Sequence, residues 1–240
     1  MSRSPYARPG TPRRRGPTTV VVCAATVVLA VAGCTVGSPD VPVRPPVVQP
    51  TGDLAEQLRT ALLVADDLTA DFRPTEPNIP DEATPTSDRP QCLALMNSLE
   101  VDPETAPGTV EVRAAFERPE YGELTQHVIR WYPQDQATER FRDAERTLRG
   151  CDRFELVYAD GFTFVETLTP DVPEVSVPAG VAVFSLSVEL TAVSGTTRGV
   201  TVLMQTGQRL GIVTFYFPDQ GRTDWAVQIA NLLAERLAAQ

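Results

Sequence analysis

Hydrophobic residues recur at helical spacing in four stretches of the chain, and elsewhere they alternate with polar residues. The helical spacing falls within Asp53–Ala65, Gln91–Leu99, Asp135–Leu148 and Asp224–Ala239. Apolar side chains at positions i, i+3, i+4 and i+7 share one face of a helix, so these stretches predict amphipathic helices packed on a core. We expect Asp53 and Thr223 to cap the first and the last helix through their side-chain oxygens.

Alternation with a period of two predicts strands, because successive side chains of a strand point to opposite faces of its sheet. Glycines at Gly122, Asp160-Gly161, Gly195 and Gly207-Gln208 separate these segments at the positions expected of hairpin turns. The segments are Val110–Phe116, Leu124–Tyr132, Phe154–Tyr158, Phe162–Val165, Val181–Val193, Gly199–Thr206 and Arg209–Phe217. The expected fold class is α+β, with an antiparallel β-sheet of about five to seven strands and helices packed on it.

Two proline-rich stretches interrupt these patterns. Thr35–Gly52 carries five prolines among valines and small residues, and proline favours an extended, solvated chain, so a semi-rigid tether is expected there. The stretch from Pro74 to Pro90 also has no apolar period, and we expect a surface loop.

The N-terminal residues have the layout of an export signal. Arginines end at Arg15, an apolar run covers Thr18–Ala32, and the small residues Ala32 and Gly33 precede Cys34. Val31-Ala32-Gly33-Cys34 resembles the bacterial lipobox, in which the cysteine is acylated and becomes the mature N-terminus. The resulting division is a signal peptide at 1–33, a tether at 34–52 and a domain at 53–240. The alternative is an uncleaved membrane-spanning signal anchor, and both readings place the domain outside the cell membrane.

The cysteine positions agree with an oxidising compartment. Cys23 would be lost with the leader and Cys34 acylated, which leaves Cys92 and Cys151 as a pair. We expect a disulfide between them, with two separate buried thiols as the alternative. A metal site is disfavoured because the pair lacks CxxC spacing and the chain has one histidine, His127.

Charge excludes one class of partner. Five arginines lie in the leader, and without them 16 basic residues face 31 acidic ones, a net charge of about −15. Such a surface repels phosphate backbones, so no nucleic acid partner is expected. The sequence also lacks a G-x-S-x-G elbow, a phosphate-binding glycine loop and H-E-x-x-H, so we expect no enzymatic activity and no cofactor.

Several short motifs together resemble one family. They are the lipoprotein leader, Leu62–Leu68, Gln91-Cys92-Leu93, Val112–Phe116, the helix before Cys151 and the closing strands and helix. Their order resembles actinobacterial sensor-domain lipoproteins and the extracellular sensor domain of PknH-type Ser/Thr kinases. The resemblance implies an antiparallel sheet with packed helices and a cleft for an undefined extracellular ligand. This chain has one disulfide pair where the kinase sensor has two.

The expected function is that of a monomeric, lipid-anchored, extracytoplasmic sensor or ligand-binding domain. Arg113, His127 and Arg130 are the candidate ligand-binding residues, since arginine in an acidic protein suits anionic ligands. Alternatively, the arginines pair with Glu111 and Glu123 on a solvated face, and His127 is structural.

Two other functions remain open from the sequence: an envelope lipid or glycolipid carrier, and an interaction scaffold in the cell envelope. A carrier needs a large apolar cavity. Aromatic residues that would line such a cavity, or else pack in an ordinary core, are Phe154, Phe162, Phe164, Phe215 and Phe217.

Overall fold

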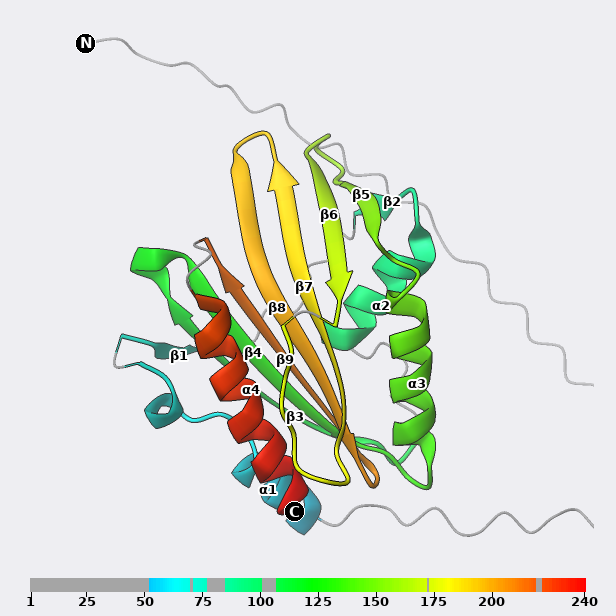
Figure 1. Ribbon diagram of the computed structural model, residues 1–240, viewed down its shortest axis with the longest axis vertical. Coiled ribbons are helices and arrows are strands. Elements are labelled where there is room, and N and C mark those ends of the chain that lie inside the picture. Colours follow the sequence, from blue (N-terminus) through cyan, green and yellow to red (C-terminus); the bar gives the residue numbers. More distant parts are fainter. Residues whose placement is uncertain (1–51, 70, 77–84, 101–106, 172, 219–221) are drawn as a thin grey trace, which may run out of the picture. The chain divides into compact units, whose positions relative to one another are not determined.

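The computed structural model describes residues 52–69, 71–76, 85–100, 107–171, 173–218 and 222–240. Nine strands of this part form one antiparallel sheet, in the order β1-β3-β4-β9-β8-β7-β6-β5-β2 (Figure 1). The predicted signal peptide, Cys34 and the whole tether except Gly52 lie outside the described residues. None of the helices in these ranges combines the length and the hydrophobicity needed to cross a bilayer.

Helices and strands follow one another as the hydrophobic pattern predicts. The strands are β1 (Arg73–Thr75), β2 (Thr86–Ser87), β3 (Val110–Arg118), β4 (Glu123–Trp131), β5 (Arg153–Val157), β6 (Thr163–Pro170), β7 (Ala182–Ala192), β8 (Gly195–Thr206) and β9 (Arg209–Phe217). The helices are α1 (Gly52–Thr60), α2 (Pro90–Glu100), α3 (Gln136–Leu148) and α4 (Thr223–Ala238), with two 3₁₀ helices, η1 (Ala65–Asp67) and η2 (Pro119–Tyr121).

The sheet has a separate hydrophobic core on each face, because its central strands are apolar on both sides. On β8, Val200, Val202 and Met204 pack with α1 and α4, while Leu203 packs on the opposite face with α2 and α3. On β9, Phe215 packs with the α1/α4 core and Ile212 with the α2/α3 core. Figure 1 shows α4 and α3 over different parts of the sheet.

The α+β class is confirmed, but the predicted count of five to seven strands is too low. The two additional strands are β1 and β2, which pair with β3 and β5 at the outer edges of the sheet. With three and two residues, they are too short to show an alternating pattern, and they border the Pro74–Pro90 stretch that we expected to be a loop. Residues 77–84 of that stretch lie outside the described part.

Two helix boundaries also differ from the prediction. The first helix ends at Thr60 instead of Ala65, and the N–H groups of Ala61 and Leu62 then bond three residues back in tight turns. This turn still buries Leu62 and Leu63 in the α1/α4 core. The last helix includes Thr223, and Arg222 occupies the cap position without a side-chain cap bond, so Thr223 is not the cap.

Candidate ligand-binding site

The structure divides the three predicted ligand residues between the two faces of the sheet. Arg113 and Arg130 lie on the α2/α3 face of the β3–β4 hairpin, where the register places Glu111 opposite Arg130. His127 lies on the α1/α4 face and receives a hydrogen bond from the backbone N–H of Leu63. Arg113 and Arg130 are therefore brought together, and His127 is not part of their site.

Arg130 joins the sheet to the end of α2. Its Nε donates to Glu111 Oε2 at 2.6 Å, and its two terminal nitrogens donate to the carbonyls of Ser98 at 2.8 Å and Leu99 at 3.3 Å. The side chain is only 3% exposed, so removing it would leave buried acceptors without a partner.

Glu111 is shared by the two arginines. Arg113 Nε donates to Glu111 Oε1 at 2.5 Å, on the other side of the carboxylate from Arg130. Burial raises the pKa of Glu111, but the hydrogen bonds from Arg113 and Arg130 outweigh it and hold the pKa below its usual value of 4.5. The Glu111 carboxylate stays charged. The two arginines pair with Glu111, as the alternative prediction had it. Glu123 instead pairs with Arg118 and Arg222.

His127 is fully buried and uncharged at neutral pH. Burial, the largest cause, and the Arg236 guanidinium together lower its pKa to about 3, against the opposing effect of the Asp67 carboxylate. Its Nδ1 is occupied as the acceptor for Leu63, 3.3 Å away. This environment is that of a structural histidine.

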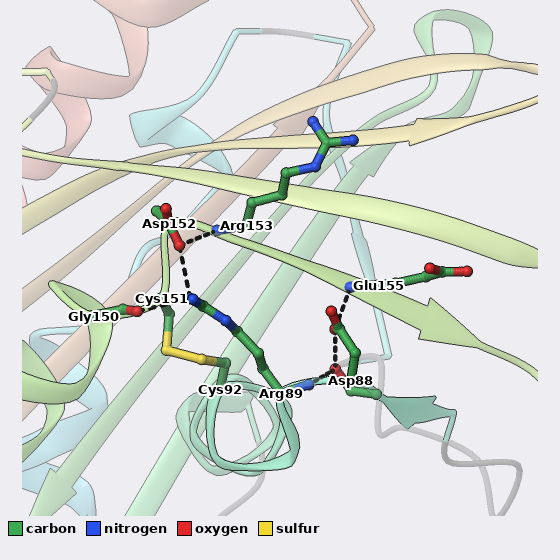
Figure 2. Close-up of a disulfide and its surroundings, with 9 residues drawn as sticks. Asp88, Arg89, Cys92, Gly150, Cys151, Asp152, Arg153 and Glu155 are labelled. Carbon is green, nitrogen blue, oxygen red and sulfur yellow. Dashed lines mark hydrogen bonds and ion pairs between the residues drawn. A yellow bond between two sulfur atoms is a disulfide. The ribbon is translucent and has the colours of Figure 1, made fainter.

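The predicted disulfide between Cys92 and Cys151 is confirmed and fixes the first turn of α2 to the segment after α3 (Figure 2). Both cysteines are buried. Beside the bond, Arg89 donates to the carbonyl of Gly150 and to Asp152, while Asp88 accepts the N–H of Glu155 on β5. The helix α2 is thus held covalently near its first residue and by Arg130 near its last.

A groove opens where α2 and α3 face each other over the sheet, with a volume of about 140 Å³. Its floor is Arg130 and Tyr132 of the β4 end and Leu210 of β9. The walls come from single stripes of the two helices: Leu95, Ser98 and Leu99 on α2, and Arg140, Asp143, Ala144 and Thr147 on α3. The mixture of an apolar lining with a few polar and charged groups is typical of small-molecule sites.

Sequence reasoning missed every wall residue of this groove, and it named only Arg130 of the floor. The α3 residues lie at spacings of three and four, and they include Ala144 of the buried stripe, so the sequence already indicated that they share one face. The cysteine pair was the feature of the sequence that indicated which helix lies opposite α3. A bond between the start of one helix and the end of the next requires the two helices to be neighbours.

No cluster of three or more His, Cys, Asp and Glu side chains suited to a metal ion occurs within the described ranges.

Comparison with known proteins identifies the fold. No family model and no curated protein matches the sequence. Among solved structures, the extracellular domain of PknH from Mycobacterium tuberculosis superposes with a TM-score of 0.60 at 14% identity, over 78% of this chain and 97% of that domain. The chain has the fold of the PknH extracellular domain. An uncharacterised Mycobacterium smegmatis protein, the Rv0999 ortholog, matches 81% of this chain and 98% of its own at 14% identity, with a TM-score of only 0.37.

The likeness to the PknH domain extends over most of this chain and nearly all of that domain. The fold resemblance predicted from the motifs is therefore confirmed. The comparison with PknH concerns the fold only, and the groove between α2 and α3 is described from the residues of this chain.

Proposed function

We propose that this protein is a lipid-anchored, extracytoplasmic, non-catalytic sensor domain that binds a small ligand in the groove between α2 and α3. The observation that carries this proposal is the groove itself, in which a buried arginine and a charged helix stripe converge beside apolar side chains. The fold shared with an extracellular domain of a kinase is consistent with a binding role outside the cell.

The size of the groove argues for a small ligand. Drug-sized ligands occupy sites of roughly 300–1,000 Å³, whereas a cavity of about 150 Å³ accommodates one benzene molecule. At about 140 Å³, the groove suits a compound of that size or a similar moiety of a larger one.

The positions of the aromatic residues argue against a lipid or glycolipid carrier, which would need a large apolar cavity. Most of the aromatic residues considered for a carrier cavity are core residues: Phe154, Phe215 and Phe217 are buried, and Phe164 packs against the α2/α3 core. Phe162 is 40% exposed, next to the β5–β6 turn. Four of the five therefore pack in the two cores, and Phe162 lies at the surface.

The lack of catalysis in this proposal is supported by the setting of His127. A general base has to reach a substrate proton directly or through one water molecule. His127 is instead buried against the turn between α1 and η1, and the α2/α3 groove lies on the opposite face of the sheet.

Anchoring through Cys34 is tested by replacing the acylated sulfur. Wild-type protein is expected in the membrane fraction of producing cells, with a diacylglycerol mass on its N-terminal peptide. Cys34→Ser should lose that mass and its membrane retention. Equal membrane retention of both proteins would favour the uncleaved signal anchor and contradict the lipid anchor.

Ligand binding is tested by thermal unfolding of the full-length protein with a panel of amino acids, short organic acids and monosaccharides. A ligand at 100 times its Kd adds about 2.7 kcal/mol, which raises Tm by about 5–10 °C for a domain of this size. Thr147→Trp, which fills the groove, should keep its own cooperative unfolding and lose the shift. A panel without effect on wild type, or with equal effect on both proteins, would contradict the proposal.

A further inference from the structure

We infer that the groove selects a small monocarboxylate with an apolar or ring substituent, an inference that rests on the binding function proposed above. Three features carry it: an arginine without a partner at the rim, a net charge of one unit in the lining, and an apolar interior of limited volume.

The rim residue is Arg140. It is exposed and lines the groove, and it forms no ion pair or hydrogen bond with any residue in the described part of the chain. The other exposed arginines near the end of α3 differ: Arg146 pairs with Asp143, and Arg149 pairs with Glu145 and Asp171. Arg140 therefore offers a free guanidinium to an anion that enters the groove.

A second guanidinium lies on the floor. Arg130 uses three of the five N–H donors of an arginine for Glu111, Ser98 and Leu99, which leaves two. Its charge is balanced by Glu111 from outside the groove, but its position in the lining is fixed by these bonds. A fixed guanidinium is a better anion receptor than a mobile one, because less conformational entropy is lost on binding.

The charge balance favours one negative charge over two. Arg130 is balanced by Glu111 and Asp143 by Arg146, so the unpaired Arg140 gives the lining a net charge of one positive unit inside a strongly acidic protein. The Asp143 carboxylate would repel a phosphate dianion, while a carboxylate adds only one charge.

The rest of the lining suits an apolar substituent. Leu95, Leu99, Ala144 and Leu210 contribute its apolar part. A volume of about 140 Å³ is close to that of a cavity known to hold benzene. We therefore place a ring or a short alkyl group against these side chains and the carboxylate near the arginines.

The test is calorimetric titration of the full-length protein with benzoate, with benzamide as its uncharged isostere and with inorganic phosphate. Benzoate is expected to bind at least ten-fold more tightly than benzamide or phosphate. Its affinity should fall as salt is raised, because screening weakens exposed ion pairs.

Three variants of α3 locate the contact. Arg140→Gln should weaken benzoate binding roughly five-fold, the scale of an exposed ion pair. Arg142→Gln is the matched control, since Arg142 is an exposed arginine of the same helix that does not line the groove, and it should bind as wild type does. Asp143→Asn should bind benzoate and phosphate more tightly.

Equal affinity for benzoate and benzamide, or equal losses in Arg140→Gln and Arg142→Gln, would overturn the inference. The proposed ligand-binding function would still hold after those outcomes if a compound of the thermal-unfolding panel described above raised the Tm of wild type but not of Thr147→Trp. Tighter binding of phosphate than of benzoate would replace the carboxylate by a phosphate group. Absence of binding by the benzoate probe together with an inactive panel would remove both proposals.

Discussion

His127 is buried on β4 against the turn between α1 and η1, and Arg236 and Asp67 are the charged groups that shift its pKa. Burial and Arg236 keep the imidazole neutral to a pKa of about 3, with Asp67 acting in the opposite direction. Asp67 itself accepts two hydrogen bonds from Arg236 and one from the N–H of Val64. The cluster ties η1 to α4, and its histidine serves as a neutral acceptor.

This histidine makes folding stability depend on pH. An unfolded histidine binds a proton below about pH 6.5, whereas the folded one stays neutral to about 3, so stability falls as pH drops through this window. Between pH 7 and pH 4.5 we expect a loss of about 2–3 kcal/mol in the free energy of urea unfolding from this residue.

The matching variant is His127→Asn, which keeps an acceptor for Leu63 but cannot be protonated. Its unfolding free energy should lack this pH-dependent loss over the same range. Identical pH slopes for wild type and variant would show that the imidazole is already charged or solvated in the folded protein.

Arg130 and Arg113 share Glu111 but differ in what else they hold. Arg130→Met removes the partner of two α2 carbonyls and one oxygen of Glu111, so we expect a loss of about 2–4 kcal/mol in urea unfolding. Arg113→Met leaves Glu111 paired with Arg130, and its loss should be about 1 kcal/mol. A reversed order would mean that Arg130 is not the main link between α2 and the sheet.

At the residue scale, the sequence grouped Arg130, which lines the groove, with His127, which does not. The two residues are three positions apart on one strand, an odd number, so the period of two already places them on opposite faces. Arg140 was not predicted, because an exposed arginine on a helix carries no signal until the neighbouring helix is known.

At the scale of elements, α2 is held at both ends by different chemistry. Cys92 fixes its first turn to Cys151, and Arg130 binds the carbonyls of its last turn. Helix α3 presents its apolar stripe to the sheet and the adjacent stripe to α2. This arrangement keeps the two walls of the groove at a fixed separation.

Removal of the disulfide should destabilise the whole domain. The cysteines are separated by 59 residues, and closing a loop of that length is worth about 4 kcal/mol in the chain-entropy model. We expect Cys92→Ala combined with Cys151→Ala to lose close to this amount in urea unfolding. A loss below about 1 kcal/mol would indicate that the unfolded chain is already restricted by residual structure.

The hydrophobic period located β3 to β9 and the four helices, because each has enough residues to show a repeat. It did not predict β1 and β2, whose three and two residues are held by pairing with β3 and β5 rather than by their own pattern. The first helix was predicted too long, since Leu62 and Leu63 remain buried after the helix has ended at Thr60.

At the scale of the whole molecule, the order of strands is the feature that local patterns do not encode. The first hairpin, β3–β4, pairs with the last strand, β9, over a separation of about eighty residues. The Arg113–Glu111–Arg130 group of this hairpin lies on the α2/α3 face of the sheet, where Arg130 binds the end of α2. The groove follows from that topology, from the disulfide and from the facing stripes of two helices.

The central claim is that the α2/α3 groove holds a small ligand, and native mass spectrometry tests it most directly. Full-length wild type and Thr147→Trp would be extracted in mild detergent from the cells that produce them and compared. We predict a small non-covalent mass on wild type, in addition to its covalent anchor, that is absent from Thr147→Trp. The same bound mass on both proteins, or none on wild type, would contradict the claim.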